Sequence, residues 1–317
     1  RTALNPEHPD LRATVQNPDI FFQVREVNNQ DYAALPEIVE EYMAEISRIT
    51  GREYHLFNYY GAKDAEKVII AMGSVSGTVC ETVDYLNKRG GKTGFLQVHL
   101  YRPFSVEHFL GALPKTVRKI AVLDRTKEMG AVGEPLYTDV RSALYGKDVT
   151  VVGGRYGLSS KDTTPADIAA VFENLDADQP KNGFTISIND DVTHLSLAPV
   201  KSVQAENDDT ISCKFWGLGS DGTVGANHST VKIINDYTDK YAQAYFEYDA
   251  KKSFGVTKSH LRFSSSPMRS AYYVKNADFI ACHNQSYIYK YDMVSELKEG
   301  GVFLLNCAFS PDELEQK

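Results

Sequence analysis

A glycine-rich turn at residues 215–230, FWGLGSDGTVGANHST, carries the clearest chemical signal in this chain. Gly217, Gly219 and Gly222 match the pattern G-x-G-x-x-G, with the apolar run ISCKFW before it and the helix-like TVKIINDY after it. In such a strand, turn and helix the glycines let the backbone approach a phosphate, and free N–H groups at the helix start attract its charge. The turn therefore predicts a site for a phosphorylated ligand.

The same glycines also have a purely structural explanation. They would make a tight turn from strand to helix, with Asp221 as the N-cap of a helix that begins near Gly222. The turn alone leaves both interpretations open.

Basic residues follow what would be the second strand of this unit, in the stretch YDAKKSFG. In dinucleotide-binding folds an acidic residue at this point holds the ribose hydroxyls, whereas basic residues there indicate a phosphate on the ribose. Asp249 would suit a bare ribose, but Lys251, Lys252 and Ser253 favour a ribose phosphate, as in NADP or the 3′-phospho-ADP of coenzyme A. Two solvated lysines on a loop explain the pair equally well.

Other conspicuous residues give weaker signals. His99 lies at a strand end, where a structural role is more common than a catalytic one. Asp124 and Arg125 also follow a strand-like run, and they suit either a ligand contact or a pair at a domain interface. No Ser/His/Asp spacing stands out, so no catalytic base is predicted.

The cysteines are scattered and lack the C-x-x-C spacing that holds zinc or an iron–sulfur cluster. Two of them lie inside apolar runs, which predicts small buried hydrophobic residues rather than nucleophiles. The four are Cys80, Cys213, Cys282 and Cys307, of which Cys213 and Cys282 are in the apolar runs. No metal site is predicted in this segment.

Composition limits the class of protein. A chain of 317 residues is long enough for two folded bodies. Its 34 Lys+Arg against 42 Asp+Glu give a net charge of −8, which does not favour nucleic-acid binding. No apolar run approaches the ~20 residues that cross a bilayer, and the first residues resemble no targeting peptide. We expect a cytoplasmic protein, and the chain looks cut at both ends.

The pattern along the chain predicts an α/β fold. Residues 1–51 would be a lead-in with one helix, ALPEIVEEYMAEISRIT, that stops at Gly51. Residues 52–205 alternate apolar strands such as KVIIAMG and KIAVLD with helices, which indicates a parallel sheet covered on both faces. The polar stretch VKSVQAENDDT marks a boundary, and residues 206–317 form a second α/β body.

Within the second body we expect the strands ISCKFWG, YAQAYFEYD, VTKSHLRF, ADFIACH and GVFLLN, a helix from the glycine turn to about Tyr237, and a helix over residues 287–301. The predicted fold class is two consecutive three-layer α/β domains with mostly parallel sheets.

Several stretches taken together resemble pyruvate:ferredoxin (flavodoxin) oxidoreductase. They are LNPEHPDLRATVQNPDIFFQVRE, MGSVSGTV, HLYRPFS, VLDRTKEMGAVGEPLY, GGRYGLSSKD, FWGLGSDGTVGANH, YDAKKSFGVTKSHLRF and ACHNQSYI. The resemblance runs in order over essentially the whole chain. It implies an internal piece of a longer enzyme that oxidatively decarboxylates pyruvate to acetyl-coenzyme A and passes two electrons to ferredoxin or flavodoxin.

The resemblance also implies an organisation. Residues 1–51 would end a pyrimidine-binding domain, residues 52–205 would resemble the C-terminal domain of transketolase, and residues 206–317 would be a truncated, Rossmann-like 2-oxoacid oxidoreductase gamma domain. Thiamine diphosphate, magnesium and the [4Fe–4S] clusters would belong to other parts of a homodimeric parent enzyme. The piece alone is therefore expected to be inactive.

For the site, the resemblance implies coenzyme A. Its phosphates would lie at the glycine turn and its phospho-ADP end at the basic loop. The family usually has lysine after GAN, whereas this chain has His228, which changes the charge at that contact. The implied coenzyme A residues are Gly219, Ser220, Asp221, Gly222, Thr223, Val224, Gly225, Asn227, His228, Lys251, Lys252 and Ser253.

Two other hypotheses remain. In one, the segment is a non-catalytic dimerisation or assembly module whose glycine turn is only structural. In the other, it is an NADP-binding reductase domain, which the resemblance disfavours.

Overall fold

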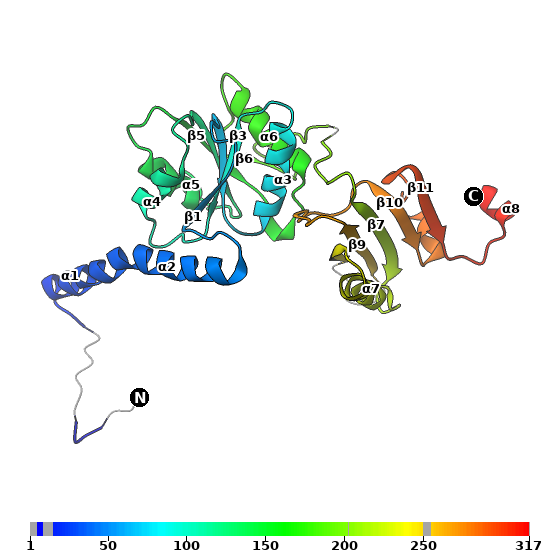
Figure 1. The fold of residues 1–317 in the computed structure, drawn as a ribbon, viewed down its shortest axis with the longest axis horizontal. Coiled ribbons are helices and arrows are strands. Elements are labelled where there is room, and N and C mark those ends of the chain that lie inside the picture. The colour runs from blue at the N-terminus through cyan, green and yellow to red at the C-terminus, as the bar shows by residue number, and fades with distance from the viewer. Residues whose placement is uncertain (1–4, 9–14, 202, 250–254, 317) are drawn as a thin grey trace. The chain divides into compact units, whose positions relative to one another are not determined.

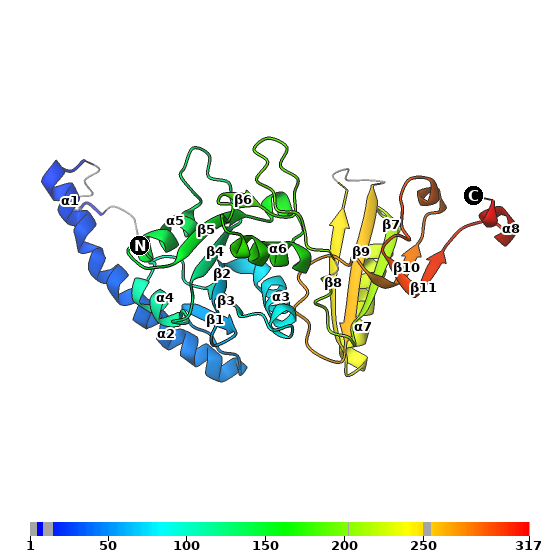
Figure 2. The same cartoon turned by 90° about the horizontal axis from the view of Figure 1, so that it is seen from above.

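The computed structural model describes residues 5–8, 15–201, 203–249 and 255–316. The chain divides into two compact units, one made of Arg1–Asn58 and Val98–Leu113 and the other of Tyr59–Gln97 and Pro114–Lys317. Figures 1 and 2 show that the second unit contains two separate sheets with their helices. The predicted domain boundaries at residues 51/52 and 205/206 stay predictions.

The first unit is built on two helices, α1 (Pro18–Val27) and α2 (Asn29–Thr50). The helix predicted from residue 34 begins earlier and runs through Pro36, and it ends as expected at Gly51, whose φ of 68° is left-handed. Ser105 caps α4 (Val106–Ala112) by accepting a hydrogen bond from the backbone of His108. The rings of three phenylalanines pack with centroids 5.3–5.7 Å apart, namely Phe57, Phe104 and Phe109.

The first sheet is the predicted parallel one. Its strands are β1 (Phe57–Gly61), β2 (Lys67–Ala71), β3 (Thr93–Val98), β4 (Lys119–Asp124), β5 (Thr150–Arg155) and β6 (Phe184–Thr185), in the order β1-β3-β2-β4-β5-β6. Strand β2 pairs in parallel with β3 and β4, as do β4 with β5 and β5 with β6. Helices α3 (Ser76–Asn87) and α6 (Pro165–Asp176) cover one face and α5 (Pro135–Ala143) the other (Figure 1).

The second sheet has five strands in the order β11-β10-β7-β9-β8. They are β7 (Ile211–Leu218), β8 (Tyr241–Tyr248), β9 (Val256–Ser264), β10 (Ala277–Cys282) and β11 (Leu297–Leu305). Strand β10 runs parallel to β7 and β11, whereas β9 runs antiparallel to β7 and β8. Helix α7 (Thr223–Tyr237) packs against β7, β8 and β9. The predicted class, α/β with two mostly parallel sheets, is confirmed.

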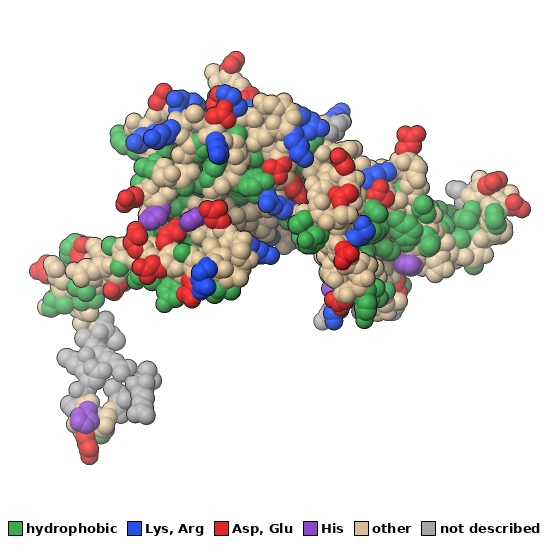
Figure 3. Space-filling model, viewed as in Figure 1, with side chains coloured by type: hydrophobic (Ala, Val, Ile, Leu, Met, Phe, Trp, Pro, Cys, Tyr) green, Lys and Arg blue, Asp and Glu red, His purple; other side chains and the backbone are tan. Residues whose placement is uncertain are grey.

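Strand β11 lies at one end of the sheet order, and it carries exposed apolar side chains. Val302 and Leu304 are 57% and 45% exposed. Hydrophobic side chains gather on this part of the surface in Figure 3.

The helix predicted over residues 287–301 is wrong. The structure has a short 3-10 helix, Gln285–Tyr289, and β11 already begins at Leu297. The Asp292 carboxylate accepts the Ser295 N–H at 3.1 Å, a local bond that competes with a helix. Pairing with β10 then draws the following residues into the sheet, which local periodicity cannot reveal.

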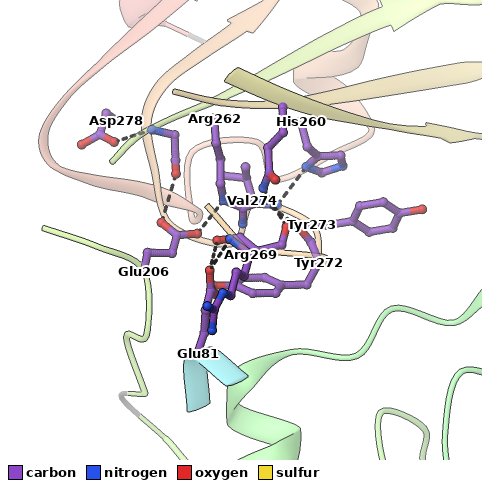
Figure 4. Close-up of polar contacts among 12 residues, drawn as sticks. Glu81, Glu206, His260, Arg262, Arg269, Tyr272, Tyr273, Val274 and Asp278 are labelled. Carbon is purple, nitrogen blue, oxygen red and sulfur yellow. Dashed lines mark hydrogen bonds and ion pairs between the residues drawn. The ribbon is translucent and has the colours of Figure 1, made fainter. Parts of the chain in front are cut away.

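Arg262 of β9 is fully buried, and its guanidinium binds two residues that lie outside the strands of the sheet. Its Nε donates to Glu206 Oε1 at 2.7 Å and its Nη1 to the Tyr272 carbonyl at 2.7 Å (Figure 4). A buried guanidinium is tolerated only with such partners. The ion pair therefore holds Glu206, which precedes β7, and the hydrogen bond to Tyr272 fixes the segment that follows β9 against the sheet.

His260, two residues earlier on the same face, is also buried. Its Nδ1 accepts the Val274 N–H at 3.1 Å, and its ring stacks on Tyr273 with centroids 4.5 Å apart. Burial lowers the pKa of His260 to about 4, and the nearby Glu247 carboxylate only partly offsets this. The imidazole is therefore neutral at pH 7.

The segment after β9 also lies against α3 of the first sheet. Glu81 Oε1 accepts the Arg269 N–H at 3.1 Å and the Ser270 hydroxyl at 2.7 Å, and its Oε2 accepts the Tyr272 hydroxyl at 2.9 Å (Figure 4). One turn earlier on α3, a Cβ at Gly77 would lie 2.2 Å from the Arg269 carbonyl oxygen. Glycine at this position permits the close contact.

We predict that His260 makes stability depend on pH. Its folded pKa lies below its unfolded value, so its contribution is complete above pH 6.5 and is lost as the pH falls toward about 4. His260→Phe keeps a ring against Tyr273 but cannot titrate, so its unfolding free energy should vary less over this range, by up to roughly 1.4 kcal/mol per pH unit. Urea unfolding at several pH values measures this.

The matched control is His228→Phe, which likewise replaces an imidazole that stacks on an aromatic ring, but at an exposed position. Equal slopes for native protein and His260→Phe would contradict the assignment.

Candidate functional site

The glycine turn after β7 is organised around the Asp221 carboxylate. Its Oδ2 accepts the Leu218 N–H and its Oδ1 accepts the Thr223 N–H, each at 2.8 Å. The Tyr287 hydroxyl, from the segment after β10, donates to the Gly217 carbonyl at 3.1 Å. Asp221 therefore satisfies the first amide of α7, as a capping side chain does, although the cap position itself is Gly222.

Gly217 has a clear packing role. A Cβ there would lie 2.6 Å from Thr223 Oγ1 and 3.0 Å from Asp221 Oδ2. Thr223 is buried, and its carbonyl accepts a hydrogen bond from the side chain of buried Asn227 at 2.9 Å. The first turn of α7 thus sits directly on the end of β7, which is the close helix–strand approach that this type of motif needs.

Four amides of the turn remain available as donors. Within the part of the chain that the structure describes, the N–H groups of Ser220, Gly222, Val224 and Gly225 have no acceptor. Ser220 and Gly222 have left-handed φ values of 75° and 92°, which shape the turn. Together with the partial positive charge at the start of α7, these donors suit an anion.

Asp221 opposes an anion at the same place. Burial disfavours its charged form, but hydrogen bonds from the Thr223 and Leu218 amides outweigh burial, and His283 adds attraction, so its pKa lies below the usual value. Asp221 is therefore ionised at neutral pH. A phosphate at this turn must lie on the side of the free amides rather than against the carboxylate.

A pocket of about 420 Å³ opens beside the turn. It lies beyond the carboxyl ends of β7, β10 and β11, and more of its lining residues are polar than apolar. The chain leaves β7 toward β8 on one side of the sheet and later places β10 on the other side, so β7 and β10 flank a topological switch point, where α/β sheets bind ligands. The lining residues are Leu218, Asp221, His283, Asn284, Gln285, Asn306, Cys307 and Ala308.

The structure brings only some of the predicted residues to this place. Asp221 lines the pocket, and the turn Gly219–Gly225 adjoins it. Asn227 is buried beneath the turn. His228 is exposed on α7 and stacks on Phe246 of β8, with ring centroids 4.2 Å apart. Lys251, Lys252 and Ser253 lie outside the described residues.

Sequence reasoning missed the far wall of the pocket. His283 and Asn306 immediately follow the apolar strands β10 and β11, and the backbone N–H of Asn306 donates to the Cys282 carbonyl at 2.9 Å. Polar residues just after parallel strands are the signal that would have found them, because such ends meet at one edge of the sheet.

The other expectations concern metals, cysteines and membranes. The two cysteines predicted to be buried are so, at 6% exposure for Cys213 and 0% for Cys282, and burial raises the pKa of both thiols. Among the residues the structure describes, no group of His, Cys, Asp and Glu side chains could hold a metal ion. None of the described helices is both long enough and apolar enough to cross a membrane.

We predict opposite effects for two glycines of the turn. Gly217→Ala should lower the unfolding free energy by about 1–3 kcal/mol, because its methyl group overlaps Thr223. Gly225→Ala should be neutral or raise it by up to about 1 kcal/mol, because no atom lies within 4 Å of the new methyl group and the position is helical. Denaturant unfolding measures both, and a similar loss in the two variants would contradict the packing described.

Comparison with known proteins adds family relationships. Residues 65–168 match the family described as pyruvate:ferredoxin oxidoreductase core domain II, and residues 212–317 match pyruvate ferredoxin/flavodoxin oxidoreductase. A crystal structure of the pyruvate oxidoreductase subunit PORC from Thermotoga maritima aligns with 34% of this chain and 56% of its own, at 19% identity and a TM-score of 0.29, which is too low to support an inference.

Two curated relatives align with nearly all of the chain. The pyruvate-flavodoxin oxidoreductase of Enterobacter agglomerans is 60% identical over 100% of it, and the pyruvate:ferredoxin oxidoreductase of Moorella thermoacetica is 56% identical over 99%. The chain spans only 27% of the length of each. With both family matches and this identity, the chain belongs to the pyruvate:ferredoxin/flavodoxin oxidoreductase family, as a segment of such a protein.

Proposed function

We propose that these residues form the coenzyme A-binding and structural portion of an enzyme that oxidatively decarboxylates pyruvate to acetyl-coenzyme A and reduces ferredoxin or flavodoxin. The observation that supports coenzyme A binding is the pocket at the switch point of the second sheet, with free amides along one wall. Family membership supports the overall reaction. The parent would be a cytoplasmic homodimer in which the other domains hold thiamine diphosphate, magnesium and the [4Fe–4S] clusters.

The residues of the pocket suit the phosphate groups of coenzyme A. The amides of Ser220, Gly222, Val224 and Gly225 can donate to phosphate oxygens, and His283 and Asn306 add polar side chains on the opposite wall. The diphosphate of coenzyme A is negatively charged and is repelled by the ionised Asp221 carboxylate, so it would lie on the side of the free amides. Lys251, Lys252 and Ser253 would contact the 3′-phosphate at the other end of the ligand.

The chemistry would come largely from groups held elsewhere. Thiamine diphosphate would supply the carbanion, and the clusters would carry the electrons. The residues of this segment would bind coenzyme A and hold its thiol in a fixed place. Their contribution to the reaction rate would therefore come from orienting the thiol. We expect the 317 residues alone to show no pyruvate oxidation.

A different class of function also has support from the site. Gly217 is explained by its contact with Thr223, and Asp221 by its two backbone hydrogen bonds, without any ligand. The turn would then be structural and the segment an assembly module. Calorimetric titration of coenzyme A into the intact protein separates the two functions, because an assembly module would give no saturable heat that depends on residues of this turn.

We predict that Lys251→Ala combined with Lys252→Ala weakens coenzyme A binding by about 1–3 kcal/mol, the range for charge-assisted hydrogen bonds. Dephospho-coenzyme A lacks the 3′-phosphate, so its affinity should change much less. Titration of both ligands into native and double-variant protein measures the difference. Equal losses for the two ligands would place the lysines away from the 3′-phosphate.

His228→Lys tests whether position 228 contacts the ligand. In the structure the imidazole packs on Phe246, so we expect the native and variant proteins to have parallel profiles of coenzyme A affinity between about pH 6 and about pH 8. If residue 228 instead contacts a phosphate, the permanently charged lysine should raise coenzyme A affinity and make the two pH profiles differ in shape. That result would overturn the packing-based expectation and restore His228 as a ligand contact.

A further inference from the structure

A second cavity, of about 210 Å³, lies at the carboxyl edge of the first sheet. Ser74 follows β2, Arg125 follows β4, and Ser160 and Lys161 follow β5. We propose that this cavity binds a small oxyanion of the size of phosphate. The site is separate from the coenzyme A pocket, and the proposal does not depend on it.

The topology puts this cavity where ligands bind in sheets of this kind. From β2 the chain first adds β3 on one side and then crosses to add β4 on the other side, as the order β3-β2-β4 shows. The connections after β2 and β4 therefore diverge and leave a crevice at the carboxyl edge. Ser74 and Arg125 lie on its two sides.

Arg125 is held in place while its outer nitrogens remain available. Its Nε donates to the Gly157 carbonyl at 3.0 Å, which anchors the guanidinium. Its Nη1 and Nη2 reach Ser74 Oγ and Ser160 Oγ only at 3.4 Å each, longer than a strong hydrogen bond. A guanidinium has five donors in a planar fork that matches an oxyanion, and this one spans two loops with its outer edge weakly engaged.

Two further groups point to an anion. The Lys161 ammonium has no hydrogen-bond or ion-pair partner among the described residues. Thr78, at the start of α3, also lines the cavity; it is 1% exposed, and its hydroxyl has no hydrogen-bond partner within the described part of the chain. A buried hydroxyl without a partner is uncommon and costly, and a bound oxyanion would give it an acceptor.

The acidic groups nearby are turned to other partners. Asp124 is adjacent to Arg125, but its carboxylate accepts the Leu136 and Tyr137 amides at 3.0 and 3.1 Å and so caps α5. Asp162 lines the cavity and accepts the Tyr273 N–H at 3.2 Å. The lining therefore has two cations, Arg125 and Lys161, against the one carboxylate of Asp162, which leaves an excess of positive charge.

The size of the cavity limits the ligand. It is smaller than the ~300 Å³ at which pockets for whole drug-sized molecules begin. The occupant is therefore a phosphate-sized group, either a free anion or the phosphate end of a larger molecule. Both have the same oxyanion chemistry, so the experiment has to distinguish them.

Lysine footprinting in the intact protein that carries this chain tests the proposal at the site itself. Lys161 and the exposed Lys127 are acylated with an amine-reactive ester, and each rate is followed by mass spectrometry as inorganic phosphate is added. We expect phosphate to slow the acylation of Lys161 saturably and to leave Lys127 unchanged. Repeating the titration with coenzyme A and with dephospho-coenzyme A shows whether a free anion or a 3′-phosphate is bound.

Arg125→Gln should raise the phosphate concentration that half-protects Lys161 about tenfold or more, because a charge-assisted hydrogen bond is lost. Arg125→Lys keeps the charge but not the fork and should show an intermediate shift, and the urea midpoints of both variants check that they fold. Lys127→Ala is the matched control and should leave the protection of Lys161 intact. Three results would overturn the proposal. The first is that none of the three ligands slows the acylation of Lys161, and the second is that Lys161 and Lys127 are slowed equally. The third is that Arg125→Gln leaves the protection of Lys161 unchanged.

Discussion

Parallel strand pairing constrains both sheets, through β2 to β6 in the first and through β7, β10 and β11 in the second, where β9 runs antiparallel to its neighbours β7 and β8. Parallel neighbours cannot be joined by a tight turn, so the chain must return through a crossover, and the loops that follow the strands gather at one edge. In each sheet a central strand is extended first on one side and then on the other, which separates the loops after β2 and β4 and those after β7 and β10. The two candidate sites lie between these pairs of loops, because the course of the backbone alone leaves a crevice there.

Contacts between the two sheets of the second unit converge on one short segment. Glu81 of α3 holds residues 269–272, and Asp162 accepts the Tyr273 N–H, while Arg262 and His260 hold the same segment from the side of β9. Burial raises the pKa values of Glu81 and Asp162, against which Glu81 accepts three hydrogen bonds and Asp162 accepts the Tyr273 N–H. Because Tyr272 and Tyr273 also line the smaller cavity, this segment links the packing between the sheets to the shape of that cavity.

Local chemistry in the sequence was enough to predict several helices and most strands, although it missed α1. Apolar runs predicted β2 and β4, and Gly51 predicted the end of α2, since those patterns are set within a few residues. The same reasoning predicted the second half of β11 as the strand GVFLLN but extended a helix over its first residues, because strand pairing with β10 is a tertiary effect. Strand β6 is short, Phe184–Thr185, because Ser187 soon turns the backbone to a left-handed φ of 70°.

For the candidate site, too, the sequence predicted the part formed by a contiguous motif and missed the part that depends on strand pairing. The glycine turn was found because its motif is contiguous, and Gly217 does have the close helix contact that the motif implies. His283, Asn306 and Cys307 reach the pocket only through the pairing of three strands that are distant in sequence, so no local pattern joined them to the turn. The sequence also singled out Arg125. The proposal for the smaller cavity depends on which groups lie next to its guanidinium, and these come from loops that are distant in sequence.

The end of the second sheet matters for handling this protein. In the described chain β11 is the last strand of its sheet, so one row of its backbone donors and acceptors has no strand beside it. Val302 and Leu304 are exposed along that strand, and no proline interrupts it. An open, apolar strand of this kind readily pairs with a second molecule. Purified preparations of these residues should therefore be watched for self-association, and a lysine at position 302 or 304 is the natural way to keep them dispersed.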